Sequence, residues 1–373
     1  MVKKKILIVF GTRPEAIKMA PVVKEFQKFP EQFETKVCVT AQHREMLDQV
    51  LGFFEIKPDF DLDLMKPAQN LSNLTSDILE SFSKVLGEYN PDFVYVHGDT
   101  TTTFAASLSA FYAGAQVCHV EAGLRTFDKK APYPEEINRQ LTGRLADYHF
   151  APTLQAKQNL LQEGVLDRNI IVTGNTVIDA LMYTVEKTKL SNNSEITNLK
   201  KIIDSNKKLI LVTGHRRENF GKGIRAICEA LKEIASRNDV QIIYPVHLNP
   251  KVQESVFSLL NGVENIHLIQ PLAYEAFVWL MNESYLVVTD SGGIQEEAPS
   301  LGKPVLLIRE TTERPEAISA GAVILVGTSK QKIIKESILL LEDEVKHKKM
   351  SQSKNLYGSG DSANKIVEFQ KGV

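Results

Sequence analysis

The residues that could do chemistry are concentrated in one segment of this chain, from Glu121 to Arg144. Glutamates and arginines gather there directly after the apolar run 116–120, which has the composition of a buried strand. Carboxylates beside a core must be paired or hydrogen-bonded, so this concentration is typical of a place where a polar molecule binds. With Asp99 nearby in the predicted fold, Glu121 and Glu135 complete a set of possible general acids and bases. We therefore expect a reaction centre here.

Some of these residues also have ordinary structural interpretations. Glu135 and Arg139 are four residues apart, so on a helix they share one face and can form a solvated ion pair. The same spacing would let Arg139 hold a carboxylate or a substrate oxygen in place. Asp99 precedes a run of threonines and could be the N-cap of a helix. Both interpretations stay open from the residues alone.

A second polar motif is suited to a diphosphate. Ser291, Gly292 and Gly293 lie between a predicted strand and a predicted helix, where backbone N–H groups and the positive end of a helix dipole can meet phosphate. Glu297 follows in the first turn and would suit ribose hydroxyls. The alternative is a capped helix, in which Asp290 and Ser291 serve only the backbone.

A third motif adds positive charge. His215 is followed by Arg216 and Arg217 after a predicted strand, where a histidine can donate to a phosphate or exchange a proton with a leaving group. A lone histidine is usually structural, but the two arginines favour an anion. Arg13 and Lys18, around the first turn of a predicted helix, could contribute from an opposite wall.

The elements that position these motifs alternate between short apolar runs and longer amphipathic stretches, the pattern of a parallel sheet with helices on both faces. We predict strands at 6–10, 36–40, 93–97, 116–121, 149–151 and 170–173, with helices such as 16–26, 71–89 and 102–112. A second series has strands at 209–213, 241–245, 266–270, 286–289, 305–308 and 323–326, helices such as 224–236 and 273–282, and final helices at 330–349 and 363–369. The fold class is α/β.

Two doubly wound, Rossmann-like domains follow from this pattern and from the length of 373 residues. We place the first at 1–185 and the second at 186–357, with a polar stretch at 186–208 between them and a helical tail, 358–373, packing back on the first. The polar motifs all follow strands, and open α/β sheets bind ligands at the carboxyl ends of their strands. We therefore expect a ligand in a cleft between the domains.

Net charge and cysteine content indicate which class of partner and which cell compartment to expect. The net charge of -2 provides no field that would attract nucleic acid or lipid, so we expect small-molecule partners. Three widely spaced cysteines in apolar runs suit buried thiols in a reducing compartment, and we expect a cytoplasmic protein. The stretch 221–226 fits a dinucleotide pattern but begins too far after its strand, and no zinc spacing is present. We expect no metal and no other cofactor.

Six segments resemble motifs of the non-hydrolysing bacterial UDP-N-acetylglucosamine 2-epimerases, and the resemblance covers nearly the whole chain. They are 11–18, 97–100, 119–125, 134–139, 213–219 and 290–297. The resemblance implies a fold of the glycosyltransferase B type, with UDP bound by the second domain, and a homodimer. The implied reaction interconverts UDP-N-acetylglucosamine and UDP-N-acetylmannosamine, for use in cell-surface polysaccharide synthesis.

The resemblance also implies a mechanism and residue roles. UDP leaves C1, a carboxylate removes the hydrogen from C2, and UDP returns to the resulting 2-acetamidoglucal after protonation from the other face. The implied catalytic residues are Asp99, Glu121, Glu135, Arg139 and His215, and the implied UDP contacts are Arg13, Lys18, Ser291, Gly292, Gly293, Glu297 and Arg314. A second, activating UDP-N-acetylglucosamine would contact Gln42, His43, Arg216 and His247. Ala68 and Glu45 depart from the arginine and glutamine that relatives carry near that second site.

Three other functions remain as alternatives. A UDP-sugar glycosyltransferase could share the fold, although the carboxylate-rich segment argues against it, because a transferase needs chiefly one base and an acceptor groove. A hydrolysing epimerase would release free N-acetylmannosamine, and a nucleotide-sugar sensor would do no chemistry.

Overall fold

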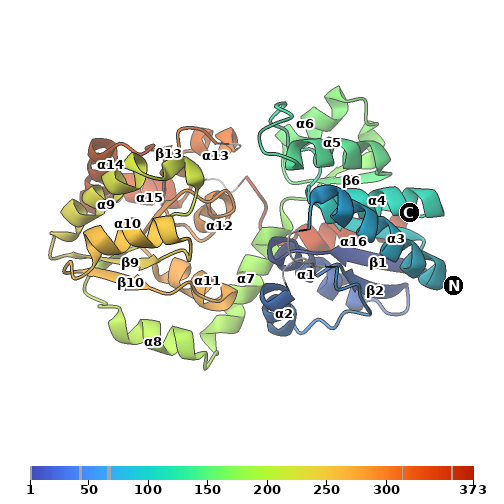
Figure 1. Ribbon diagram of the computed structural model, residues 1–373, viewed down its shortest axis with the longest axis horizontal. Helices are drawn as coiled ribbons and strands as arrows, with labels where there is room; N and C mark the ends of the chain where they lie inside the picture. Colours follow the sequence, from blue (N-terminus) through green and yellow to red (C-terminus); the bar gives the residue numbers. More distant parts are fainter. Residues whose placement is uncertain (1, 42–43, 65–68, 313, 354–355) are drawn as a thin grey trace. The chain divides into compact units, whose positions relative to one another are not determined.

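The computed structural model describes residues 2–41, 44–64, 69–312, 314–353 and 356–373. It divides into two compact units, the first made of Met1–Ala180 and Tyr357–Val373, the second of Leu181–Leu356. Each unit contains one parallel sheet with helices between its strands (Figure 1), so the predicted α/β class is confirmed. Every helix within the described ranges is too short or too polar to span a bilayer.

The sheet of the first unit has seven strands in the order β3-β2-β1-β4-β5-β6-β7, and all neighbouring pairs are parallel. The strands are β1 (Lys4–Phe10), β2 (Phe33–Val39), β3 (Phe60–Asp61), β4 (Phe93–His97), β5 (Gln116–Val120), β6 (Tyr148–Ala151) and β7 (Ile170–Val172). Ile6 to Phe10 are at most 1% exposed, because helices cover both faces of this strand. The sequence did not predict β3, which has only two residues and no apolar run.

The helices of the first unit are α1 (Arg13–Gln27), α2 (Arg44–Phe53), α3 (Leu71–Tyr89), α4 (Thr101–Ala113), α5 (Glu135–Leu145), α6 (Leu154–Gln162) and α16 (Ser362–Gly372). Of these, α1, α3, α4 and α6 begin at a side-chain cap. At α1, the Thr12 hydroxyl accepts from the Glu15 N–H and the Glu15 carboxylate accepts from the Thr12 N–H, with Pro14 in the first turn. This capping box fixes the turn directly after β1.

The second unit has a six-stranded sheet in the order β10-β9-β8-β11-β12-β13, again parallel. Its strands are β8 (Lys208–Thr213), β9 (Val240–Pro245), β10 (Ile266–Ile269), β11 (Leu286–Thr289), β12 (Val305–Leu307) and β13 (Val323–Leu325). Its helices are α8 (Ser194–Ile202), α9 (Lys222–Ala235), α10 (Pro250–Leu260), α11 (Tyr274–Glu283), α12 (Ile294–Ser300), α13 (Pro315–Ser319), α14 (Lys330–Glu342) and α15 (Glu344–Ser351).

One predicted helix is wrong. The stretch 330–349 is two helices rather than one, because Asp343 has an extended backbone and its carboxylate accepts from the Lys346 N–H at 2.9 Å. Asp343 thus ends α14 and caps α15. An aspartate inside a charged amphipathic run gives little sign of this role in the sequence.

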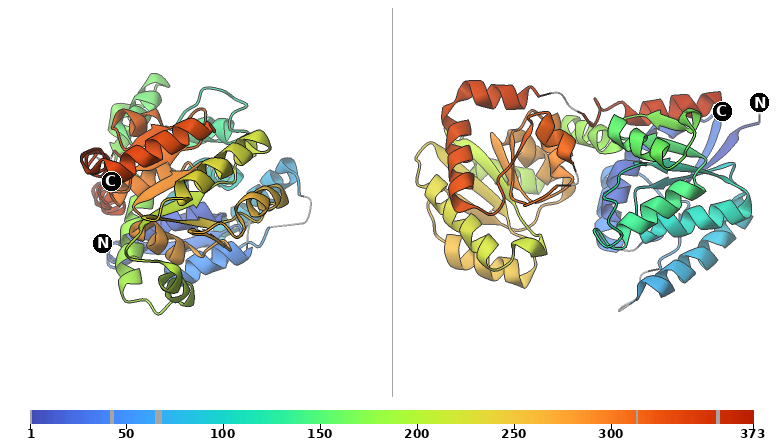
Figure 2. Two further views of the ribbon diagram at one scale, coloured as in Figure 1. Left: turned by 90° about the vertical axis from the view of Figure 1, so that its left-hand side faces the viewer. Right: turned by 90° about the horizontal axis from the view of Figure 1, so that it is seen from above.

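The chain passes from the first unit to the second within α7 (Thr176–Lys189) and returns just before Tyr357. After the return, α16 packs on α1 in the first unit. Lys4 Nζ donates to the Gln370 carbonyl at 2.8 Å, and the Tyr95 hydroxyl donates to Gln370 Oε1 at 2.6 Å. Figures 1 and 2 show this red helix among the elements of the first unit. The boundary placed after residue 185 stays a prediction.

Candidate active site

In the first unit, Glu121 is the residue immediately after β5, and its carboxylate is held by nitrogen groups from two other segments. Lys18 of α1 forms an ion pair with Oε2, and Asn175, after β7, donates its Nδ2 to the same oxygen at 2.7 Å. His97, at the end of β4, brings Nε2 to 3.7 Å from Oε2. The backbone of Glu121 has φ +60°, a left-handed conformation that is uncommon outside glycine and recurs at functional sites.

These neighbours determine the charge of Glu121. Its side chain is only 8% exposed, and burial alone would raise its pKa. The positive charge of Lys18 and the nearby His97 ring outweigh burial and hold the pKa of Glu121 well below its ordinary value. Glu121 is therefore a fixed anion near neutral pH. Lys18, which the sequence suggested for UDP, lies on this carboxylate in the structure.

Arg139 of α5 joins two further carboxylates. Its Nε donates to Asp99 Oδ2 at 3.1 Å and its Nη2 contacts the same oxygen, while its Nη1 donates to Glu136 Oε2 at 3.0 Å. The alternative of Asp99 as an N-cap is wrong, because Thr100 caps α4 by accepting from the Thr103 N–H. Asp99 is left to pair with Arg139.

The expected ion pair between Glu135 and Arg139 is absent from the described contacts, since Arg139 pairs with Glu136 instead. Glu136 is fully buried and also accepts from the backbone N–H groups of Thr126 and Phe127. Burial raises the pKa of Glu136, and these hydrogen bonds and Arg139 lower it below its usual range. Glu135 is half-buried and makes no hydrogen bond or ion pair with any described residue. It is the available carboxylate of the group.

The structure corrects the expectation that the whole charged segment forms one centre. The Arg125 side chain is fully buried and donates to both carboxylate oxygens of Glu163, at 2.6 and 2.7 Å. Arg144 is exposed. Conversely, the sequence did not single out Glu15, which is buried and joins two loops by accepting from the Gly11 N–H and the Thr100 hydroxyl.

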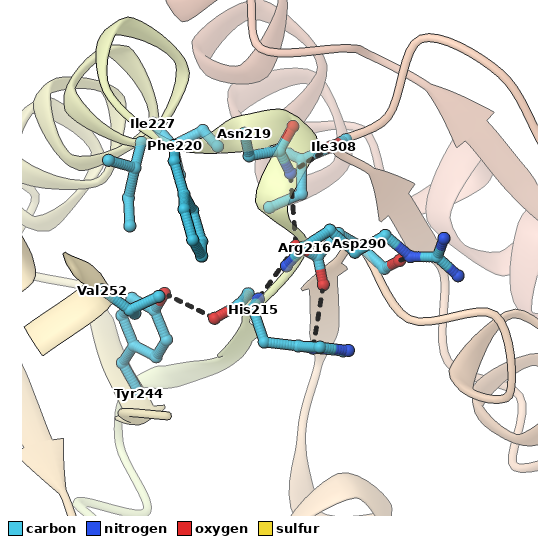
Figure 3. A pocket seen from close by; sticks show the side chains of 11 residues that line it. His215, Arg216, Asn219, Phe220, Ile227, Tyr244, Val252, Asp290 and Ile308 are labelled. Carbon is cyan, nitrogen blue, oxygen red and sulfur yellow. Dashed lines mark hydrogen bonds and ion pairs between the residues drawn. The ribbon is translucent and has the colours of Figure 1, made fainter. Parts of the chain in front are cut away.

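In the second unit, Asp290 follows β11 and organises the loop after the neighbouring strand β8 (Figure 3). Its buried Oδ2 accepts from the backbone N–H groups of His215 and Arg216, both at 2.9 Å, and from Asn219 Nδ2 at 3.2 Å. The alternative of a capped helix is wrong here, because α12 has no side-chain cap. Asp290 instead fixes the position of His215.

His215 combines a fixed ring with access to solvent. Its Nδ1 lies 3.2 Å from Asp290 Oδ1, and its side chain is 45% exposed. Burial would raise the pKa of Asp290, but the contacts with His215 and the backbone N–H groups hold that pKa below its usual range. Figure 3 shows the other ring nitrogen pointing away from Asp290. An imidazole oriented by a carboxylate in this way can exchange a proton with a bound group.

A small pocket lies beside this pair. It is lined by Gly214, His215, Arg216, Asn219, Phe220, Ile224, Ile227, Tyr244, Val252, Asp290 and Ile308. Its volume of about 10 Å³ is room for about one water molecule, so it is too small for a nucleotide.

The glycine turn before α12 is shaped by Arg314. The Arg314 guanidinium pairs with Glu296 and lies so close to Gly292 that a Cβ there would come within 2.9 Å of Nη1. A side chain at this position would therefore push the guanidinium aside. Among the described residues, nothing accepts from the N–H groups of Gly292 or Gly293, so both can meet an anion. Glu297 is half-buried in the first turn of α12.

Comparison with known proteins identifies the family of this chain. A family model described as UDP-N-acetylglucosamine 2-epimerase matches residues 24–371. The chain belongs to this family. The UDP-N-acetylglucosamine 2-epimerases of Salmonella typhimurium and of Escherichia coli K12 are each 58% identical to it over 370 residues, which is 98% of this chain and 98% of each relative. The resemblance seen in the motifs is confirmed.

Solved structures of UDP-N-acetylglucosamine 2-epimerases agree. The Neisseria meningitidis protein, bound to UDP-GlcNAc, has a TM-score of 0.91 and 52% identity, covering 99% of this chain and 100% of that chain. The Methanocaldococcus jannaschii protein, in complex with UDP-GlcNAc and UDP, has a TM-score of 0.81 and 34% identity over 99% of this chain and 100% of that chain. These neighbours confirm the predicted glycosyltransferase B type of fold.

The remaining residues suggested by the epimerase motifs are only partly placed. Arg13 is half-buried at the start of α1. Of the suggested activator contacts, Arg216 donates from Nε to the Asp290 carbonyl at 3.0 Å, and the His247 ring stacks on His215 at 5.5 Å between centroids. Gln42, His43 and Ala68 lie outside the described residues, and Glu45 is exposed in the first turn of α2.

Proposed function

We propose that this chain is a non-hydrolysing epimerase that interconverts UDP-N-acetylglucosamine and UDP-N-acetylmannosamine at C2. The observation that carries the proposal is the set of carboxylates in the first unit. Glu121 is held as an anion by Lys18, Asp99 is held by Arg139, and Glu135 has no described partner. Relatives at 58% identity that are described as UDP-N-acetylglucosamine 2-epimerases support the substrate.

The C2 hydrogen of the sugar is not acidic, so the reaction begins at C1. The bond between C1 and the diphosphate oxygen breaks, and its electron pair leaves with UDP. Positive character at C1 makes the C2–H bond labile, and a carboxylate takes that proton as the C1–C2 double bond forms. A proton delivered to the other face of C2 and return of UDP to C1 give the epimer.

The described contacts support a division of roles among the carboxylates. Glu135 is free to take up a proton, because nothing described pairs with it. Glu121 is a fixed anion that favours positive character in the sugar, and Asp99 is oriented by Arg139. Asp99 is the candidate for serving the opposite face of C2, where a proton must be delivered.

The second unit supplies groups for UDP. The N–H groups of Gly292 and Gly293, with Ser291, would hold the diphosphate, and Arg314 would add positive charge. From the first unit, Arg13 and Lys18 of α1 would add positive charge as well. Glu297 would take the ribose. His215, oriented by Asp290, would assist the departing diphosphate oxygen.

The wider biology forms part of the same proposal. We expect a cytoplasmic homodimer whose product supplies N-acetylmannosamine units for cell-surface polysaccharide. We also expect a second, activating UDP-N-acetylglucosamine at Gln42, His43, Arg216 and His247. Contacts of Arg216 with Asp290 and of His247 with His215 support this, because a ligand that moved either would act on the proposed catalytic histidine.

Incubation with UDP-N-acetylglucosamine in deuterated water, followed by NMR of the sugar, tests the proposal. We expect deuterium at C2 of a manno product that is still linked to UDP. Free sugar would indicate the hydrolysing reaction instead. A protein that leaves C2 unlabelled would be a transferase or a sensor.

A further inference from the structure

Asn175 lies in the turn between β7 and α7, and the epimerase motifs assign it no role. It is 2% exposed, and it is bonded in three directions. Its Nδ2 donates to Glu121 Oε2 at 2.7 Å, its Oδ1 accepts from the Val177 N–H at 3.1 Å, and its backbone N–H donates to the Tyr357 carbonyl at 2.6 Å. A buried amide with this many partners is fixed in place.

The network also fixes which way the amide faces. An amide oxygen cannot donate, and the Val177 N–H requires an acceptor, so Oδ1 must face Val177. The amide nitrogen is then the atom that meets Glu121. Lys18 and Asn175 both contact Oε2, so this oxygen is the one by which the protein holds the carboxylate.

The same turn fastens both segments by which the chain crosses between the units. α7 begins at Thr176 and carries the chain out of the first unit, and Tyr357 is the first residue of the returning segment. Asp179 of α7 accepts from the Ser362 and Ala363 N–H groups, at 3.2 and 2.8 Å, and so caps α16.

Gly174 shows how closely the returning segment is packed on the turn. It has φ +91°, and a Cβ there would lie 2.7 Å from Ser362 Oγ and 2.9 Å from the Tyr357 carbonyl oxygen. The turn and the returning segment therefore share one tightly fixed position, and Asn175 extends it to the Glu121 carboxylate.

We propose that Asn175 is a positioning residue for Glu121, holding its Oε2 by a hydrogen bond and tying the carboxylate to the place where the chain crosses between units. This inference rests on the proposed epimerase function. The charged and titratable groups that face Glu121 are Lys18 from α1 and His97 from β4. Asn175 connects Glu121 to the returning segment, through its Nδ2 on the carboxylate and its backbone N–H on the Tyr357 carbonyl.

Asn175→Asp tests the role directly. The substitution keeps an acceptor for the Val177 N–H and keeps the backbone bond to Tyr357, but it replaces the donor at Glu121 with a second carboxylate. We expect kcat/KM at pH 7.5 to fall about 10- to 100-fold, and the acid limb of its pH profile to move to higher pH, because a like charge raises the pKa of Glu121.

Asn159→Asp is the matched control. Asn159 is also a buried asparagine, and its Nδ2 donates at 2.9 Å to the Gly123 carbonyl, two residues from Glu121. We expect this variant to lose stability while keeping the wild-type acid limb. Equal shifts of the acid limb in both variants would overturn the inference, because the effect would then be general disturbance of the loop.

Asn175→Ser covers the case in which Asn175→Asp does not fold. Serine keeps an oxygen near the Val177 N–H, removes the amide donor and adds no charge. The acid limb of the pH profile should therefore still move to higher pH, but by less than in the aspartate variant. A wild-type pH profile in a folded Asn175 variant would contradict the role of Asn175. Absence of C2 deuteration by the wild-type protein would instead contradict the epimerase function, so the two failures are distinguishable.

Discussion

The two units use carboxylates in different ways. In the first, Glu121 and Asp99 pair with the side-chain cations Lys18 and Arg139, so charges are fixed at set positions. In the second, Asp290 is used mainly to accept from backbone N–H groups and leaves His215 exposed. Under the proposed function, this difference suits a division of labour, in which one unit would stabilise charge on a sugar and the other would present donors to an anion.

Glu135→Gln should have the largest effect, because it removes the one carboxylate of this set in the first unit without a described partner. We expect kcat to fall about 1,000-fold, within the range for a general base, with the UDP dissociation constant unchanged. Steady-state kinetics and calorimetry with UDP check both. Glu163→Gln is the control, because its partner Arg125 is structural, and it should change kcat less than about twofold. Equal losses of kcat in the two variants would contradict a catalytic role that is specific to Glu135.

Asp290→Asn should act through binding as well as turnover. The amide removes a charged acceptor from the His215 and Arg216 N–H groups, and hydrogen bonds to charged groups contribute about 1.5–3 kcal/mol. We expect UDP affinity and kcat/KM each to fall about 10- to 100-fold. Asp239→Asn, at a half-exposed carboxylate paired with Arg237 in the same unit, should leave both unchanged. Loss of turnover with intact UDP affinity would contradict a binding role for the second unit.

The fold was largely predictable because β-branched and leucine runs in parallel strands are buried on both faces and stand out in a sequence. The partner of each charged side chain could not be predicted in this way. Glu135 and Glu136 are adjacent and look equivalent, yet the helix turns Glu136 toward Arg139 and the core. Thr100 takes the cap that Asp99 could have taken, and Asn175 resembles any asparagine beside a glycine in a turn. Such choices depend on which strands are neighbours, which local patterns do not specify.

Acid should affect the first unit before the second. Burial lowers the pKa of His119 to about 3 and that of His149 to about 4, so both are neutral in the folded unit. Below about pH 6.5 both histidines are protonated in the unfolded chain but not in the folded one. The free energy of unfolding therefore decreases as the pH is lowered, by about 1.4 kcal/mol per pH unit for each histidine. Hydrogen exchange of fragments at pH 7, 6 and 5 should show the first unit losing protection first. His119→Gln should reduce the dependence of stability on pH. Equal loss of protection in both units would contradict the assignment of this acid sensitivity to His119 and His149.

Arg144→Ala should have the smallest effect. The side chain is exposed, unlike that of Arg139 on the same helix, and we expect less than about 0.5 kcal/mol in the free energy of unfolding and less than about twofold in kcat. Urea unfolding measures the change in the free energy of unfolding, and steady-state assays measure the change in kcat. A tenfold loss of turnover would restore the idea that the whole charged segment acts as one centre.

Departure of UDP from C1 is the step on which every assignment depends, and positional isotope exchange measures it most directly. UDP-N-acetylglucosamine carrying ¹⁸O in the bridge between C1 and the β-phosphorus would be incubated with the protein in deuterated water and then recovered. We expect ¹⁸O in non-bridging positions of the β-phosphate in molecules that have also gained deuterium at C2. Complete deuteration at C2 with all of the ¹⁸O still in the bridge would contradict C1–O cleavage as the route to the epimer.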